Sequence, residues 1–515
     1  RSNMDEIKSI PKEKFEFAEA QDFTHERELT TKPVGYFRDA FRRFCKNKGS
    51  VIAACIIIAL ILFAIIAPLC SAYTVDYSDA YYTFTRPKSK IFASTSFWDG
   101  CSEETMNEEA FRRLYAMGLE TGHNAVKNQE YEIIESDGNK MYRFRMDSYH
   151  KNGMVYMRLN NDEYLSLQAY QSETGKQVLY PTIRKKDRPE AVQDQTDANY
   201  YYKTKRYKGK TQTVYDENGN IIPVYKSHAV GGTRIDRYES IRIPEPEGIE
   251  YEYAIPVDTG WEVRVNYYEY YIYYHSYVLK DGIKEPSFLF GTTSTGQDVF
   301  TALASGARFS FIFSIIVASV NLFVGAIYGA IEGYYGGKVD LIMERISDIL
   351  AAVPFMIVIT LLQLYMGSSS QMLILFIAFF LTGWLSIASR TRMQFYRYKN
   401  QEYVLAARTL GARDGRLMFK HIFPNALGTL ITGSVLVIPG MIYSETNLSY
   451  LGIINLSSGN LTSVGTLLAS GQPYLSTFPH IILFPSIFLA LLMLSFNLFG
   501  NGLRDAFNPS LRGSD

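Results

Sequence analysis

The sequence contains few of the residues from which metal and disulfide sites are built. Its 515 residues include only four cysteines and seven histidines. The histidines are scattered without an HExxH cluster, and the cysteines have neither the spacing of a zinc site nor that of a disulfide framework. Cys70 and Cys101 could pair if both lie outside the cell, although free buried thiols are the simpler interpretation. No metal site is therefore predicted.

The sequence also lacks an excess of charge and the motifs of common enzymes. Lys plus Arg and Asp plus Glu both number 52, so the formal net charge is zero and no nucleic-acid partner is expected. No GxSxG motif occurs. The string GYYGGKVD is not a phosphate-binding loop, because its first glycine is misplaced and Val339 stands where serine or threonine is needed. We therefore expect no cofactor in this chain and no catalytic residue.

The sequence does contain six long, nearly uncharged apolar runs. Each is close to the length needed to cross a hydrocarbon core of ~30 Å, so each is predicted to be a transmembrane helix. We do not expect the first run to be a signal peptide, since it begins late and its end, Pro68-Leu69, does not resemble a cleavage site. The runs cover residues 51–69, 310–331, 349–367, 373–389, 427–443 and 481–499.

Two clusters of basic residues predict one orientation for these runs. Cytoplasmic segments of membrane proteins are rich in Lys and Arg. One cluster, within residues 38–48, precedes the first run, and another, within residues 390–420, follows the fourth. An even number of spans places both clusters on the cytoplasmic side. We expect a multi-pass cell-membrane protein, in contact with lipid, whose N- and C-termini are cytoplasmic and whose residues 72–290 are extracellular.

This topology divides the chain into four parts. Residues 1–50 are expected to form a cytoplasmic tail that ends in an interfacial amphipathic helix or, alternatively, in an ordinary basic segment. Residues 51–71 form transmembrane helix 1, residues 72–290 an inserted extracellular domain, and residues 291–515 a domain with helices 2–6. Within that last domain, residues 391–426 form a long cytoplasmic loop.

The inserted segment is rich in tyrosine and in hairpin signals. Asp-Gly or Asn-Gly pairs flanked by β-prone residues recur at 137–138, 152–153, 218–219 and 281–282. One helix is predicted after Thr105, which forms a capping-box pattern with Glu108. We expect a mainly-β (α+β), antiparallel domain with one helical element. Its tyrosines are consistent either with packing in a sheet or with docking of a partner or ligand.

The cytoplasmic loop contains the string EYVLAARTLGARDGRLMFKHIFPN, which is too basic to lie in a bilayer and yet has a helical pattern. Val404, Ala407 and Leu410 give the first helix an apolar side, and Gly411 can end it in a left-handed conformation. Asp414 can cap a second short helix, and Pro424 follows near its end. The small residues leave the backbone open to close approach by another protein.

This string resembles the coupling loop of ABC importer permeases, written E-A-A-x-x-x-G followed by nine residues and I-x-L-P. Ala406, Ala407 and Gly411 match, and Pro424 falls in register. Leu405 replaces the glutamate of the motif, a departure that is typical of the oligopeptide/dipeptide branch, as are Glu402-Tyr403-Val404 and HIFPN. The segments FRDAFRRFCKNKGS, GYYGGKVDLIMERISDILAAVP and FNLFGNGLRDAFNPSLRG resemble the same branch.

The resemblance implies an all-α polytopic membrane protein with six transmembrane helices, similar to type I ABC importers, carrying the inserted domain between helices 1 and 2. It implies that the chain is half of a translocation path for peptides and pairs with a second homologous permease subunit. Two cytoplasmic ATPase subunits would use ATP and Mg, and an extracellular substrate-binding protein would deliver the peptide. The residues expected to couple the permease to the ATPases are Glu402, Ala406, Ala407, Gly411, His421 and Pro424.

Other functions remain open at the level of sequence. Some members of the branch carry nickel complexes or oligosaccharides instead of peptides. A membrane-anchored ligand sensor would leave the loop at 402–425 without a purpose. An anchored extracellular hydrolase would need a catalytic cluster, and none is recognisable.

Overall fold

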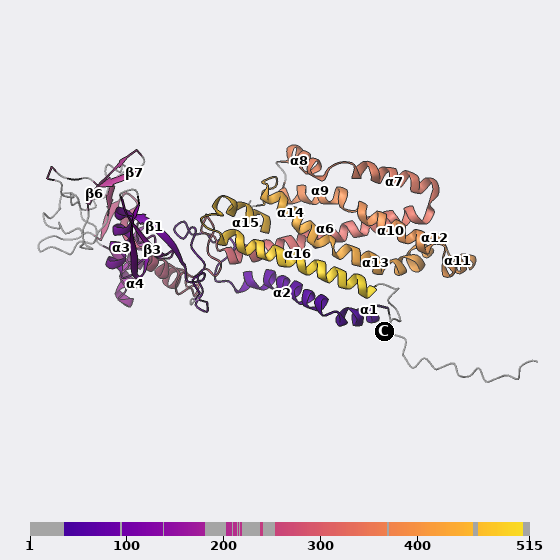
Figure 1. Cartoon of the computed structure of the whole chain (residues 1–515), viewed down its shortest axis with the longest axis horizontal. Helices are drawn as coiled ribbons and strands as arrows, with labels where there is room; N and C mark the ends of the chain where they lie inside the picture. The colour runs from indigo at the N-terminus through magenta and orange to yellow at the C-terminus, as the bar shows by residue number, and fades with distance from the viewer. Residues whose placement is uncertain are drawn as a thin grey trace, which may run out of the picture.

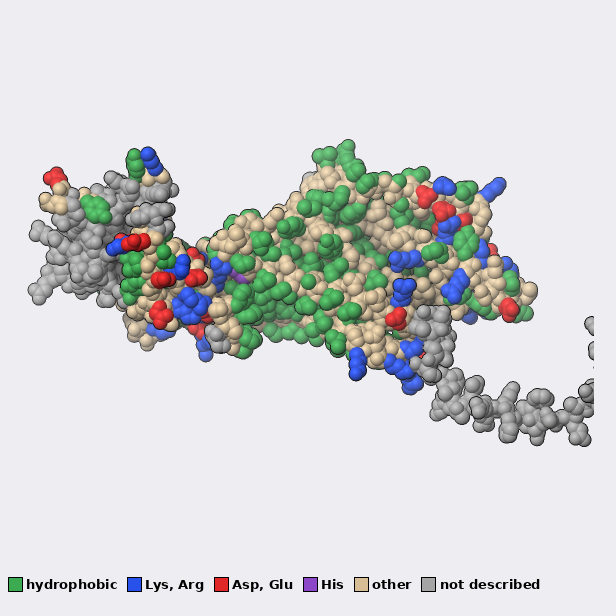
Figure 2. Space-filling view, viewed as in Figure 1, with side chains coloured by type: hydrophobic (Ala, Val, Ile, Leu, Met, Phe, Trp, Pro, Cys, Tyr) green, Lys and Arg blue, Asp and Glu red, His purple; other side chains and the backbone are tan. Residues whose placement is uncertain are grey.

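The computed structural model describes residues 36–92, 95–136, 139–180, 253–367, 370–456 and 462–507, with short pieces between 202 and 239. It contains a bundle of long helices and a β-rich domain, which lie at opposite ends of an elongated molecule (Figure 1). Hydrophobic side chains spread over the bundle, whereas charged side chains gather at the two ends (Figure 2). We call the end with helix α11 (Glu402–Thr409) the α11 end and the other the insertion end.

Within the described ranges, five helices are long and apolar enough to cross a membrane, or six if one bent pair counts as a span. The pair is α7 (Gly337–Ala351) and α8 (Phe355–Met366), which meet at 71°. The expected span over 349–367 includes this bend, because Pro354 lies at the break and cannot continue a helix from the preceding residues. The continuous spans are α2 (Lys48–Cys70), α6 (Val299–Tyr335), α9 with α10 (Gln371–Gly383 and Leu385–Tyr398), the run Asp414–Tyr450, and α16 (His480–Phe507).

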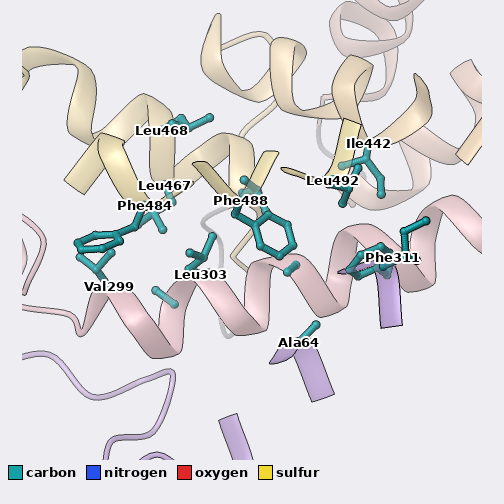
Figure 3. Close-up of a cluster of buried hydrophobic side chains, with 14 of the residues drawn as sticks. Ala64, Val299, Leu303, Phe311, Ile442, Leu467, Leu468, Phe484, Phe488 and Leu492 are labelled. Atoms are coloured by element: carbon teal, nitrogen blue, oxygen red, sulfur yellow. The ribbon is translucent and has the colours of Figure 1, made fainter. Parts of the chain in front are cut away.

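Apolar side chains from four parts of the chain meet along α6. Ala64 of α2, Leu303 of α6 and Phe488 of α16 belong to one buried cluster, as Figure 3 shows. Ile442 of α14 (Val437–Tyr450) and Leu467 of α15 (Val464–Gly471) complete it. Helix α1 (Tyr36–Lys46) joins the bundle from the side, where Phe44 packs edge-on against Phe499 with ring centroids 5.3 Å apart. Helix α6 is thus the element that the other spans share.

Helices α6 and α10 pack closely, and glycine makes this contact possible. Gly325, Gly329 and Gly333 recur every four residues and so lie on one side of α6. A Cβ atom added at Gly329 would lie 2.1 Å from the carbonyl oxygen of Ala388. One turn earlier, the buried Asn321 amide donates to the carbonyl of Phe379 at 3.2 Å. Small residues at such positions allow packing between helices where lipid supplies no hydrophobic drive.

Gly329→Ala should therefore destabilise the bundle. The added methyl group has no room, and overpacking of this kind costs about 1–3 kcal/mol. We expect a lower apparent melting temperature in detergent by thermal aggregation. Gly440→Ala is the control, because this helical glycine has nothing within 4 Å of the new Cβ atom. Equal effects of the two substitutions would contradict the assigned packing.

The inserted part contains antiparallel sheets, as expected. The first sheet has the order β1-β3-β2 and carries α3; the second joins β4, β10, β5 and β9 and carries α4, α5 and η4. A third, small sheet has the order β7-β6-β8. The bounds are β1 (Cys101–Asn107), α3 (Glu108–Thr121), β2 (Val126–Ser136), β3 (Asn139–Asp147), β4 (Met154–Leu159), α4 (Asn161–Thr174), β5 (Leu179–Tyr180), β6 (Tyr202–Tyr207), β7 (Lys210–Thr213), β8 (Arg237–Glu239), β9 (Ala254–Val257), β10 (Gly260–Asn266), α5 (Tyr267–Tyr273) and η4 (Tyr274–Leu279).

Of the predicted hairpin turns in this part, one connects two paired strands and two do not. Ser136 pairs with Asn139, so a two-residue hairpin connects β2 and β3; the turn residues themselves lie outside the described residues. The pair at 152–153 instead joins two different sheets, and that at 281–282 follows η4, so neither makes a hairpin. Residue 219 of the fourth pair also lies outside the described residues.

The helices of the inserted part differ from the prediction. Helix α3 is present, but Asn107 caps it by accepting from the amide of Ala110 at 2.9 Å, whereas Thr105 lies in β1. Helices α4 and α5 were not expected. The tyrosine-rich string YYEYYIY forms α5 because the side chain of Asn266 accepts from the amide of Glu269 and starts a helix after β10.

All four cysteines are free in the structure, so Cys70 and Cys101 do not form a disulfide. Three of them, Cys45, Cys55 and Cys70, are exposed on the isolated chain, and the expectation of buried thiols is therefore wrong for these. Cys101 is partly buried, and burial raises the pKa of its thiol to about 12.

Candidate functional site

The predicted coupling loop forms a compact helical element at the α11 end, the end farthest from the inserted domain (Figure 1). Helix α11 follows α10 closely and is succeeded by α12 (Asp414–Arg416), the π-helical turn η5 (Leu417–Ile422) and α13 (Phe423–Val435). Helix α1 and the end of α16 lie toward this same end of the bundle.

Helix α11 stops at Gly411, as predicted. The backbone of Gly411 has φ +85°, a left-handed conformation that favours glycine. The amide of Gly411 donates to the carbonyl of Arg408 at 3.0 Å, and the amide of Ala412 donates to that of Ala407 at 3.1 Å. This pair of hydrogen bonds is the Schellman arrangement, which satisfies carbonyl groups that the helix end would otherwise leave open.

The inner side of α11 is anchored in an apolar cluster. Val404 is fully buried and packs with Phe395 of α10 and with Leu417 and Ile422 of η5, while Ala407 lies partly buried beside them. The expectation that Leu410 shares this side is wrong, because its side chain is 88% exposed. Cluster and cap together hold α11 as a rigid piece on α10 and η5.

The outer side of α11 is open. Glu402, Ala406, Leu410 and Gly411 are exposed, and a Cβ atom at Gly411 would meet nothing within 4 Å. We call these four residues the α11 surface. An exposed leucine beside small residues gives a shallow apolar patch with direct access to the backbone, a form suited to contact with another protein.

The two remaining predicted residues lie behind this surface. His421 is half-buried in η5, and Pro424 is exposed in the first turn of α13. The expectation that Pro424 marks the end of a helix is wrong, since the helical run continues unbroken from Asp414 to Tyr450. Pro424 has no amide hydrogen to donate within this run, and the wider π turn before it accommodates the ring.

Asp414 also has a different role from the one predicted. It does not cap α12, whose N-cap position is held by Arg413. Its carboxylate instead accepts a hydrogen bond of 2.6 Å from the hydroxyl of Tyr334 near the end of α6. Arg408 of α11 donates to the same hydroxyl at 3.4 Å. The start of the long helix is thereby tied to α6 and to α11.

A second connection at the α11 end was not recognised from the sequence. The guanidinium group of Arg392 in α10 donates to both carboxylate oxygens of Asp340 and, at 2.7 and 2.9 Å, to both of Glu344. Tyr396 donates to Asp340 at 2.6 Å. From the sequence alone, Arg392 is only one member of the basic cluster within residues 390–420. The available signal was the spacing of Asp340 and Glu344, which puts both on one face of α7.

Nothing in this element resembles a catalytic or metal centre. Across the described residues, no group of three or more His, Cys, Asp or Glu side chains is placed to hold a metal ion. Lys399, which follows α10, donates to the carbonyl of Gly333 at 2.9 Å, and partial burial lowers the pKa of its ammonium group. The hydrogen bonds of this element connect its helices to one another, and the α11 surface remains exposed for contact with another protein.

Arg392→Ala should release α7 from α10. The substitution leaves Asp340 and Glu344 without their shared partner, and loss of a charged hydrogen-bond partner costs about 2 kcal/mol. We expect faster amide hydrogen exchange in α7, measured by mass spectrometry in detergent. Arg345→Ala is the control, since its ion pair with Asp348 is exposed and such pairs contribute about 0–1 kcal/mol. Unchanged exchange in α7 would show that the network does not hold this helix.

Comparison with known proteins agrees with this geometry. The family described as the binding-protein-dependent transport system inner membrane component matches residues 321–513, which include the α11 surface. The N-terminal transmembrane domain of oligopeptide transport permease C matches residues 35–87. The inserted sheets fall between the two matched segments.

Individual relatives likewise match less than half of this chain but about 70% of their own length. The oligopeptide transport system permease protein OppC of Bacillus subtilis is 43% identical over 223 residues, which are 43% of this chain and 72% of the relative. The dipeptide transport system permease protein DppC of the same organism is 38% identical over 224 residues, 43% of this chain and 69% of the relative. The OppC protein of Escherichia coli is 37% identical over 228 residues, 44% of this chain and 74% of the relative.

Proposed function

The chain belongs to the oligopeptide and dipeptide permease branch of the binding-protein-dependent transport inner membrane components, and we propose that it forms half of a peptide path driven through the α11 surface. Its relatives are named as permease proteins of oligopeptide and dipeptide transport systems. The other half of the path would come from a second, homologous permease. An extracellular binding protein would deliver the peptide, and two ATPase subunits, the users of ATP and Mg, would supply the force from the cytoplasm.

The single observation that carries this proposal is the continuity between the α11 surface and a membrane span. Helix α11 packs through Val404 on η5, and η5 continues without a break through α13 and α14 to Tyr450. A helix transmits displacement because every backbone hydrogen bond along it must be kept, above all in lipid. A push on α11 therefore moves the whole run, whereas a flexible joint would absorb it.

The residues of the loop divide between contact and shape. Glu402, Ala406 and Gly411 are exposed and would meet an ATPase subunit directly. Ala407 packs inward, and His421 and Pro424 lie where the π turn passes into α13, so these three would fix the geometry. The basic residues around α11 support a cytoplasmic location for this end.

The same orientation would place the inserted domain outside the cell, where the binding protein arrives. The chain then needs few residues that select among peptides, because the binding protein selects the cargo before transfer. The names of the relatives favour peptides over nickel complexes and oligosaccharides.

Gly411→Val should weaken the mechanical connection between the ATPase subunits and the permease. Valine at a left-handed position costs about 1–2 kcal/mol and would distort the cap of α11. In vesicles containing the complete transporter, we expect peptide uptake and peptide-stimulated ATP hydrolysis to fall at least about tenfold, the equivalent of 1.4 kcal/mol. The permease should still assemble in the membrane.

Gly175→Val is the matched control. Gly175 ends α4 in the inserted domain with φ +68° and also has open space around a new Cβ atom. Its strain is comparable, but helix α4, which it ends, lies far from the α11 end (Figure 1). Normal uptake by Gly411→Val, or an equal loss in Gly175→Val, would count against coupling through this surface. A purified chain that brings along no ATPase subunit and no second permease would refute the proposed assembly.

A further inference from the structure

A small lobe at the base of the inserted domain carries an apolar tip that no part of the described chain covers. The lobe comprises residues 88–92 and 95–99. At its tip the side chains of Ile91, Phe92 and Phe97 are 83%, 48% and 39% exposed. Single exposed apolar residues are normal on protein surfaces, but three within one short lobe call for an explanation.

The lobe has a defined conformation. Lys88 and Asp99 form an antiparallel bridge at its base, and the amide of Ser89 donates to the carbonyl of Trp98 at 3.0 Å. Nearer the tip, the amide of Thr95 donates to the carbonyl of Phe92 at 2.9 Å. The exposed side chains are therefore held in place by backbone hydrogen bonds beneath them.

One side of the lobe rests on a membrane span. The rings of Phe97 and Trp98 lie 6.0 and 6.1 Å from that of Phe484, measured between centroids. Phe484 is the fifth residue of α16, so it lies about 6 Å along the axis from the start of that span. The lobe thus lies beside the first turns of α16, a helix long and apolar enough to span a membrane.

The opposite side of the lobe is polar and bound to the first sheet. The carboxylate of Asp99 accepts from Lys127 of β2 at 2.6 Å and from Arg145 of β3 at 2.7 Å. Lys90 is paired with Glu285 at the rim. The lobe is therefore amphipathic across its thickness, with charges toward the domain and aromatic side chains toward the span.

We propose that Ile91, Phe92 and Phe97 insert into the boundary between headgroups and acyl chains of the bilayer, and so anchor the inserted domain on the membrane surface. The occupant of this apolar tip is lipid. Its surface continues from the contact with Phe484 on a spanning helix, and aromatic residues with a flanking lysine are typical of membrane interfaces. The indole of Trp98 fits the same location, because its nitrogen donates to the carbonyl of Leu289 at 2.9 Å while its ring faces apolar neighbours.

The proposal goes beyond peptide transport, since the lobe lies outside both segments matched by the permease families. Its consequence is mechanical. The ion pairs of Asp99 connect the sheet to the lobe, and the lobe would connect the sheet to the bilayer. The bilayer contact would then add to the packing of Phe84 on Phe478 in holding the domain in a fixed orientation relative to the bundle.

Spin labelling tests the proposal on the full chain. A variant without the four native cysteines would carry Ile91→Cys, labelled with a nitroxide, in vesicles of phosphatidylcholine and phosphatidylglycerol. Ile133→Cys on β2 is the control, since Ile133 is likewise an exposed isoleucine of the inserted domain, at 54%. Oxygen concentrates in lipid and a nickel chelate in water. We expect the ratio of oxygen to nickel collisions to be several-fold higher at position 91 than at position 133.

Two outcomes would overturn the proposal. Equal ratios at both positions would place the tip in water, and low collision rates with both reagents at position 91 would place it against protein. A second measurement retains the native cysteines and compares quenching by brominated lipid in the unmodified chain and in Trp98→Phe. Trp384, which lies within a span, and Trp261 of β10 contribute equally to both. Loss of a lipid-quenched component in Trp98→Phe is expected, and identical quenching would also refute lipid contact.

Discussion

The bilayer requires every spanning segment to satisfy its backbone hydrogen bonds within the protein, and the rest of this structure depends on that constraint. It explains why the helical run from Asp414 to Tyr450 passes through two prolines, Pro424 and Pro439, and a π turn without opening. It also explains the packing of α6. Since lipid gives helices no hydrophobic reason to associate, Gly325, Gly329 and Gly333 provide close backbone contact in its place.

The same constraint decides what the sequence could reveal. Spans are predictable because length and apolar composition suffice to define them, and the runs on α2, α6, α9 and α16 all lie within observed helices. Apolar composition does not show the direction in which a helix runs. It therefore does not predict the bend between α7 and α8, although Pro354 lies at that bend. At the α11 end, Gly411 was predictable from backbone chemistry alone. Tyr334 with Asp414, and Arg392 with Asp340, were not, because these pairs join residues far apart in the sequence.

Local sequence signals predict the structure of the inserted domain less well than apolar composition predicts the spans. Strand pairing near 137–138 followed from turn chemistry, but the tyrosine string after Asn266 has strong β propensity and still forms a helix. Its tyrosines mostly pack: Tyr271 and Tyr267 are buried with Tyr82 and Phe288 at the base of the domain. The carboxylate of Asp79 accepts from the Tyr267 hydroxyl at 2.7 Å and from two backbone amides, which fixes the first residues after α2 against α5. Packing, and not partner docking, accounts for these tyrosines.

Helix α6 unites the two ends of the molecule. At the insertion end, Asp298 caps it by accepting from Thr301, and burial raises the pKa of this carboxyl to about 6. The hydroxyl of Thr301 lies 2.6 Å from that of Ser71, the residue after α2. At the α11 end, the hydroxyl of Tyr334 donates to Asp414 at the start of the helical run Asp414–Tyr450. Under the proposed coupling, a displacement of α12 would therefore act along a single helix of 37 residues on the base of the inserted domain. If both proposals hold, a domain anchored on the membrane would resist this displacement, and the lobe and the α11 surface would act on opposite ends of α6.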